Sequence, residues 1–170
     1  MLAQEHDRST QTNDLKVEPK FEQLFVAQLQ YNDRVDVKIP MDGTTGDLIG
    51  RGDGVVKGEK INGTITWAYY AENCAYLWTK EGQEPPPDMH LCKTNPGGFI
   101  KTNDGATIRF DARGYGLRGP EPSRPHVWRM TSALQFHAED KRYEWLNTAL
   151  GVWEGEFDEI AGKAVYRAFI

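Results

Sequence analysis

The sequence predicts an all-β protein, either a closed antiparallel barrel or a sandwich, and two observations support this prediction. From residue 21 onward, short runs rich in valine, isoleucine, threonine and aromatic residues alternate with glycine and with Asp-Gly or Asn-Gly pairs. Turn signals recur about every 8–12 residues, and little of the chain has a helical pattern. A chain of 170 residues with this pattern is expected to form a single domain.

Nine strands are expected from these runs. They cover residues 22–31, 46–51, 54–57, 61–72, 98–103, 107–115, 127–137, 148–157 and 163–170. The run Asn103, Asp104, Gly105 predicts a hairpin, because these residue types tolerate the positive φ angles of tight turns, and a second hairpin is expected over 159–162. The segment 138–147 contains no glycine or proline, so one or two helical turns are expected there. The segment 79–95 contains three consecutive prolines and is expected to be an exposed loop or lid.

Charge and polarity set limits on location and partners. Residues 1–20 are polar and lack a periodic apolar pattern, so we expect a disordered tail followed by one domain over 21–170. The 20 Lys and Arg against 25 Asp and Glu give a net charge of −5, which argues against nucleic acid or a membrane surface as a partner. Neither a spanning helix of about 20 apolar residues nor the apolar run of a signal peptide is visible. We therefore expect a cytoplasmic protein.

The alternation of side chains predicts one buried, aromatic face. Ile65, Trp67 and Tyr69 fall on one side of their strand, and threonines and an alanine fall on the other. The same separation occurs in the strand that begins at Val127. The last strand is expected to be partly covered on both faces, which would suit either a strand at a subunit contact or one packed under the segment 138–147.

Several familiar sites are disfavoured by the sequence. The glycine-rich run 50–54 is followed by no helical pattern and no Lys-Ser or Lys-Thr pair, so a nucleotide loop is not predicted. Cys74, His90 and Cys92 lack the paired short spacings of a structural zinc site. Two thiols are expected rather than a disulfide, and no metal or cofactor is predicted. No serine stands in a Gly-x-Ser-x-Gly setting.

Charged residues within strands are the candidates for acid–base chemistry. Glu154 shares a strand face with Leu150 and Val152, and burial there would raise the pKa of its carboxyl group. Asp53 is either an inward carboxylate or a turn former. Arg129 lies centrally in its strand, where its charge would act on a nearby carboxylate.

Arg113 alternates with Arg109 and Asp111 along one strand face, a pattern typical of a solvated outer surface. His126 and His137 stand at opposite ends of one expected strand, each either a general base or a solvated rim residue.

Aromatic residues gather before the proline-rich segment. Trp67, Tyr69, Tyr70, Tyr76 and Trp78 lie within a dozen residues of one another. They would serve either as core filling or as the lining of a pocket for a flat or apolar molecule.

Four further segments resemble one family. The domain of unknown function 3237 has segments similar to the run 50–63, the run Thr102 to Ile108, Arg142-Tyr-Glu-Trp-Leu-Asn147 followed by Gly151, and the C-terminal strand with Val165 and Tyr166. The resemblance covers about residue 21 to the C-terminus. It implies a small antiparallel barrel similar to calycins and lipocalins, with a central cavity, and a homo-oligomer, either a dimer or a larger assembly. The commonest family version has a Pro-Gly-Gly-rich turn ending in Asp-Trp where this chain has residues 66–73.

The leading hypothesis is a cofactor-independent enzyme, of lyase, isomerase or cyclase type, that transfers protons on a small apolar or aromatic molecule in the barrel. Its catalytic residues would be Asp53, Glu154, Arg113, Arg129 and Tyr69. Its substrate-binding residues would be Trp67, Trp78, Tyr166, His126 and His137. The alternatives are a carrier of lipocalin type, expected if the cavity is lined only by apolar and aromatic groups, and an oligomeric interaction protein, expected if the barrel is filled.

Overall fold

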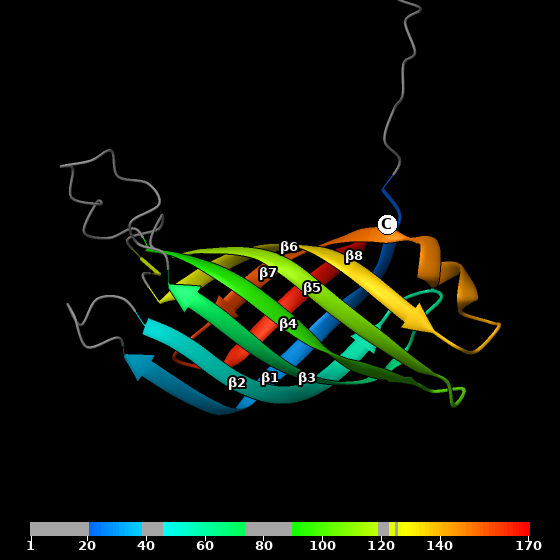
Figure 1. Cartoon of the computed structure of the whole chain (residues 1–170), viewed down its shortest axis with the longest axis horizontal. Helices are drawn as coiled ribbons and strands as arrows, with labels where there is room; N and C mark the ends of the chain where they lie inside the picture. The colour runs from blue at the N-terminus through cyan, green and yellow to red at the C-terminus, as the bar shows by residue number, and fades with distance from the viewer. Residues whose placement is uncertain (1–20, 39–45, 74–89, 119–122, 125) are drawn as a thin grey trace, which may run out of the picture.

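Eight strands close into one antiparallel barrel in the computed structural model, which describes residues 21–38, 46–73, 90–118, 123, 124 and 126–170 (Figure 1). The strands are β1 (Gln23–Lys38), β2 (Gly46–Lys57), β3 (Gly63–Asn73), β4 (His90–Thr102), β5 (Thr107–Arg118), β6 (Val127–Ala138), β7 (Leu150–Asp158) and β8 (Lys163–Phe169). Each strand pairs with the next, and β8 pairs with β1. One short 3-10 helix, η2 (Glu144–Thr148), connects β6 to β7. The predicted all-β barrel with one short helix is confirmed, and the tail predicted over 1–20 lies outside the described residues.

Several predicted boundaries differ from the structure. β1 continues to Lys38 instead of ending at residue 31, and β5 continues to Arg118 instead of ending at residue 115. The runs 46–51 and 54–57 form the single strand β2, so the barrel has eight strands rather than nine. Residues 90–95 belong to β4 rather than to a loop, whereas residues 79–89 lie outside the described residues. The two predicted hairpins are present, with φ angles of 91° at Gly105 and 63° at Gly162.

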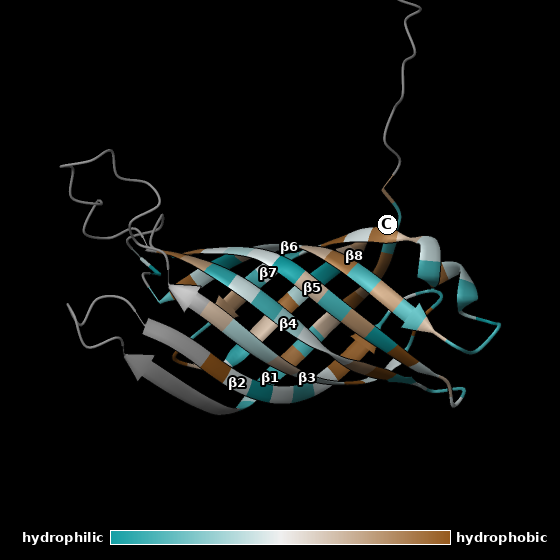
Figure 2. Cartoon of the chain, in the orientation of Figure 1, coloured by the Kyte–Doolittle hydropathy of each residue, from teal (hydrophilic) through white to brown (hydrophobic). Residues whose placement is uncertain are grey.

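Strict alternation along the strands separates an apolar interior from a polar exterior, as the changing colours along each strand in Figure 2 show. In β6 every second residue from Trp128 to Ala138 is buried, and the residues between them are exposed. In β3, Ile65, Trp67 and Tyr69 are buried as the sequence predicts. No helix in the described part of the chain is long and apolar enough to cross a membrane.

Glycines at inward positions make room for the largest side chains. A Cβ atom at Gly52 would lie 2.8 Å from the Trp67 ring, and one at Gly155 would lie 2.8 Å from the Tyr166 ring. Contacts this short do not occur between real side chains, so only glycine fits opposite these rings. Gly52 of the glycine-rich run 50–54 is therefore explained by packing against Trp67 inside the barrel.

The segment after β6 closes one end of the barrel (Figure 1). Leu146 of η2 is fully buried and joins the hydrophobic core, as does the neighbouring Tyr143. The side chain of Asn147 accepts a hydrogen bond from the Ala138 backbone N–H at 2.7 Å and donates one to the Ala138 carbonyl at 2.9 Å. These contacts hold the segment against the end of β6.

Asp104, in the β4–β5 hairpin, holds the segment before η2 against the same end of the barrel. Its carboxylate accepts hydrogen bonds from the Tyr143 hydroxyl at 3.0 Å and from Arg142 at 2.9 Å. The hydrogen bond from Thr102 contributes most to holding the pKa of the Asp104 carboxyl group below its ordinary value. These hydrogen bonds thus connect two segments that are far apart in the sequence, Thr102 to Ile108 and Arg142 to Asn147.

β8 is exposed on its outer face, in contrast to the prediction that both of its faces are partly covered. Ala164, Tyr166 and Ala168 point inward and are buried, whereas Val165 and Arg167 are exposed. Pairing with both β1 and β7 leaves β8 no open edge.

A matched pair of leucine substitutions tests the closed end. Leu146→Ala removes a fully buried side chain, and we expect it to lower the free energy of unfolding by about 2–5 kcal/mol. Leu150→Ala changes a side chain that is 69% exposed, and we expect a loss of less than about 0.5 kcal/mol. Urea unfolding monitored by circular dichroism measures both, and equal losses would contradict the role assigned to η2.

Candidate functional site

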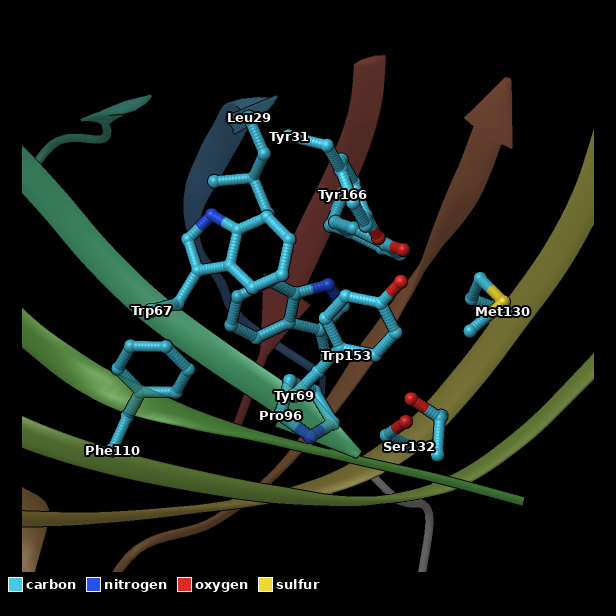
Figure 3. Close-up of a pocket in the computed structure, with 11 residues that line it drawn as sticks. Leu29, Tyr31, Trp67, Tyr69, Pro96, Phe110, Met130, Ser132, Trp153 and Tyr166 are labelled. Atoms are coloured by element: carbon cyan, nitrogen blue, oxygen red, sulfur yellow. The ribbon is translucent and has the colours of Figure 1, made fainter. Parts of the chain in front are cut away.

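A cavity lies inside the barrel in the half that is away from η2. Its lining comes from β1, β3, β4, β5, β6, β7 and β8, and consists of Leu29, Tyr31, Trp67, Tyr69, Thr94, Pro96, Phe110, Met130, Ser132, Trp153 and Tyr166 (Figure 3). Its free space is about 20 Å³, which is room for about one water molecule. The cavity is therefore almost filled by its own side chains.

Tyr31 is at the centre of the aromatic contacts in this cavity. Its ring stacks on Phe157 with 4.1 Å between ring centroids and meets the Trp67 ring edge-on at 4.4 Å. Tyr31 is only partly buried, and the pairing of β1 with β2 shifts register between Tyr31 and Asp33. A bulge of this kind re-aims the side chain beside it.

Three tyrosine hydroxyls from three different strands gather in the cavity. Figure 3 shows the oxygen atoms of Tyr31 (β1), Tyr69 (β3) and Tyr166 (β8) close together. The side chains of Tyr31 and Tyr166 interact with one another through their hydroxyls. Burial raises the pKa of Tyr31 and of Tyr166, and the interaction with Tyr166 raises the pKa of Tyr31 further. Both hydroxyls are thus neutral hydrogen-bonding groups at neutral pH.

The remaining polar groups of the cavity are also uncharged. Thr94 and Ser132 are buried inward residues that carry hydroxyls. The indole nitrogen of Trp67 is buried and has no hydrogen-bond partner among the described residues, and Figure 3 shows it pointing toward Leu29. A buried donor without a partner carries a free-energy cost that a bound oxygen atom would relieve.

The structure brings together three of the residues predicted for the site. Tyr69, Trp67 and Tyr166 all line the cavity, although they come from strands that are far apart in the sequence. Trp78, predicted to hold the substrate with them, lies outside the described residues. Trp67 and Tyr69, which the sequence suggested as pocket lining, therefore lie in the wall of the cavity inside the barrel.

The two carboxylates predicted to transfer protons lie on the outer surface. Glu154 is exposed on β7 and stands opposite Arg167 of β8. Its face of β7 is the outer one, because Trp153 takes the inward position. Asp53 is exposed on β2, and its carboxylate accepts a 2.8 Å hydrogen bond from the Asn32 side chain. Neither carboxylate has the desolvated environment that the sequence hypothesis requires.

The two arginines named with them are also exposed. Arg113 lies on the outer face of β5, close to the surface ion pair between Arg109 and Asp111 at 2.6 Å. Arg129 lies on the outer face of β6, opposite Glu156 of β7. The structure does not bring these arginines into the cavity with Tyr69.

The histidines lie at opposite ends of β6, as predicted. His126 is partly exposed and stands 3.6 Å from the Asp158 carboxylate. His137 is exposed on the outer face. Neither is among the residues that line the cavity.

Eight of the eleven lining residues were not named as site residues from the sequence, and for some of them the sequence contains a signal. Tyr31 continues the inward alternation of Phe25, Ala27 and Leu29, and Ser132 is the one polar residue in the inward row of β6 from Trp128 to Phe136. Trp153 alternates with two inward glycines of β7. Thr94 lies in the segment interpreted as a loop, so its inward position could not be inferred.

Comparison with solved structures supports the barrel. A conserved protein of unknown function from Rhodopseudomonas palustris matches with a TM-score of 0.65 and 21% identity, over 88% of this chain and 95% of the other. A β-barrel-like protein from Acinetobacter baumannii matches with a TM-score of 0.65 and 15% identity, over 89% and 96%. An enzyme from Penicillium herquei matches with a TM-score of 0.56 and 16% identity, over 89% and 95%. At these identities the likeness concerns the fold alone.

No curated protein matches this chain. The family model described as "Protein of unknown function (DUF3237)" matches residues 19–170. This range includes all eight strands and every residue of the cavity. The chain therefore belongs to the DUF3237 family.

Proposed function

We propose that this protein binds a small, flat and largely apolar molecule inside the barrel, in the cavity lined by Tyr31, Trp67, Tyr69 and Tyr166. The observation that carries the proposal is the difference between the two halves of the interior. The half beside η2 is packed with aliphatic side chains and the rings of Phe25, Phe136 and Tyr143, whereas the other half holds aromatic rings together with several hydroxyls and an indole N–H. Aromatic walls with a few polar groups are typical of small-molecule sites.

The small free volume means that side chains must move when a ligand enters. Met130 is suited to this, because an unbranched thioether side chain adopts many conformations at low cost. Tyr31 is suited because it is only partly buried and lies beside the bulge of β1. An eight-stranded barrel has an interior just wide enough to be filled or to hold one small ligand.

Enlarging the cavity tests the binding proposal. Met130→Ala removes a lining side chain, so a ligand no longer has to displace it, and we expect acetophenone to bind about tenfold more tightly than to the unmodified protein. Titration followed by the indole N–H signals in ¹H–¹⁵N spectra measures the affinity and reports on Trp67 and Trp153. Phe99→Ala, which changes a side chain that is 48% exposed on the outer face, serves as the control and is expected to leave the affinity unchanged. If acetophenone shifts no cavity signal in the Met130→Ala protein, the barrel is filled and the proposal fails.

The neutral tyrosines predict how stability depends on pH. In the unfolded chain Tyr166 and Tyr31 ionise near their ordinary pKa of 10.0, whereas the folded protein keeps their protons to higher pH. Their contribution to stability is therefore fully present below pH 10 and is lost as the pH rises above it. We expect the free energy of unfolding to fall above pH 10 and to fall less steeply in Tyr166→Phe, as measured by urea unfolding at several pH values.

The control is a comparison of the unmodified and Tyr166→Phe proteins below pH 10. The difference between their free energies of unfolding should not change with pH between about pH 7 and 9. An equal slope above pH 10 in both proteins would show that Tyr166 titrates normally in the folded state.

Acid–base catalysis is the second candidate. The three converging hydroxyls favour it, since neutral phenols can stabilise negative charge that develops on a substrate oxygen. The structurally similar Penicillium herquei protein is described as an enzyme. The lining residues include no carboxylate and no histidine. In this proposal the tyrosines stabilise the substrate's charge, and water accepts the proton.

Deuterium exchange tests this second candidate. If the hydroxyls stabilise an enolate, the methyl protons of acetophenone should exchange with D₂O faster in the presence of the protein than in buffer, and Tyr166→Phe should abolish most of the acceleration. Proton NMR measures the loss of the methyl signal. Binding without accelerated exchange would support the carrier and contradict the enzyme.

The homo-oligomer expected from the sequence stays a proposal. Its support is a set of exposed apolar side chains on the outer face. Ile49 of β2 and Tyr70 of β3 are directly opposite one another and are 48% and 44% exposed, and Tyr115 of β5 is 55% exposed. Contact between copies through this face would cover them.

A further inference from the structure

The ring of Tyr31 fills a slot between aromatic side chains of two other strands. The Phe157 ring of β7 stacks on it, with 4.1 Å between ring centroids and 25° between ring planes. Trp67 and Tyr69 of β3 meet it edge-on, with 4.4 and 5.4 Å between centroids. Stacked and edge-on contacts are the arrangements that aromatic rings prefer. The slot therefore has the shape of one flat six-membered ring.

Tyr31 is less enclosed than the rings around it. Trp67, Tyr69 and Phe157 are buried. Among the eleven described residues that line the cavity, Tyr31 and Pro96 alone are partly exposed. The proline ring is locked to its own backbone, whereas a tyrosine side chain turns between rotamers. Tyr31 is thus the lining side chain that can turn toward solvent without crossing the core.

The backbone of Tyr31 is held in place, so this movement concerns the side chain alone. The Tyr31 N–H donates a hydrogen bond to the Gly162 carbonyl at 2.8 Å, and the Gln30 side chain donates another to the same carbonyl at 3.0 Å. Directly after Tyr31 the pairing of β1 with β2 shifts register, and Asn32 has no partner residue in that ladder. A bulge beside a side chain changes the direction in which it points. The ring can therefore leave the slot while the barrel stays closed.

We infer that the slot filled by the Tyr31 ring is the ring-binding subsite of the cavity, and that a ligand binds by displacing this ring and taking over its contacts with Phe157, Trp67 and Tyr69. The inference rests on the proposed binding of a small molecule and adds where its ring binds. The free space of about 20 Å³ holds about one water molecule. A ligand ring can therefore enter only where a side chain leaves.

The same slot defines the class of ligand, which is an uncharged molecule with a single six-membered aromatic ring. Its walls are aromatic faces and edges, which favour a flat ring over a puckered one. The lining residues include no Asp, Glu, Lys, Arg or His. A charged group on the ring would lose its hydration without a counterion.

Tyr31→Ala tests the subsite with phenol, which has the atoms that the substitution removes. Because the Tyr31 ring and the ligand compete for one slot, an open state populated at about 10% or less weakens binding at least about tenfold. We expect phenol to bind Tyr31→Ala at least about tenfold more tightly than the unmodified protein, and to raise the thermal unfolding midpoint of the variant. Calorimetric titration and thermal unfolding measure both. Equal affinities for the two proteins would overturn the inference.

Two variants and a second pair of probes serve as controls. Tyr31→Phe keeps a ring in the slot, so its affinity for phenol should stay within about threefold of that of the unmodified protein. Tyr115→Ala removes a tyrosine ring that is 55% exposed on the outer face, and it should change neither readout. In Tyr31→Ala, benzene should bind about fivefold more tightly than cyclohexane. Equal binding of these two probes would overturn the assignment of an aromatic ligand.

The displacement is also measurable in the unmodified protein, which does not depend on the folding of a variant. Nuclear Overhauser effects between the ring protons of Tyr31 and Phe157 should be present in the free protein. At saturating acetophenone they should disappear, and effects between the acetophenone ring and Phe157 should replace them. If acetophenone binds and the Tyr31–Phe157 effects persist, the displacement inference fails and binding in the cavity stands. If phenol does not bind Tyr31→Ala and acetophenone does not bind Met130→Ala, both the inference and the proposed function fail.

Discussion

The interior volume of a closed eight-stranded barrel is the constraint on which the rest of this structure depends. The interior of such a barrel is just wide enough to be filled by the inward side chains of its strands. Large rings fit only where a neighbouring inward position is empty, and glycine provides that space beside Trp67 and Tyr166. At Gly116 a Cβ atom would meet the sulfur atoms of Met130 and Cys92 at 2.5 and 2.7 Å. The positions of the glycines therefore determine where the aromatic and sulfur-containing side chains can gather, and so where a site can form.

The same limited interior places charged side chains on the outside of the barrel and aromatic side chains on the inside. Inward positions in a narrow barrel are desolvated, so charged side chains are found at the alternate, outward positions. The interior is left with neutral polar groups, and tyrosine is one of the few residue types that combine a large ring with a hydrogen-bonding group. Chemistry inside this barrel therefore depends on neutral donors, whereas the ion pairs of Arg109, Arg118 and Arg142 act at the surface and at the ends.

Local sequence patterns predicted the fold well, because alternation and turn chemistry are properties of neighbouring residues. The inward row Ile65, Trp67 and Tyr69 and the turn at Gly105 follow from a few consecutive positions. The site was predicted only in part, since it depends on which face of each strand closes inward. Glu154 has apolar neighbours on its own face, Leu150 and Val152, yet that face of β7 is the outer one.

The hydroxyl cluster could not be predicted, because Tyr31, Tyr69 and Tyr166 come from three strands that meet only when the barrel closes. The pairing of β8 with β1 places Tyr166 opposite Ala27, two inward positions before Tyr31. This register, which no local pattern specifies, brings the two hydroxyls close to one another. Closure of the barrel thus both creates the confined aromatic space and positions the polar groups within it. A small molecule that enters this space must replace contacts among rings that already pack well, so the fit of its shape to these rings is a main source of its selectivity.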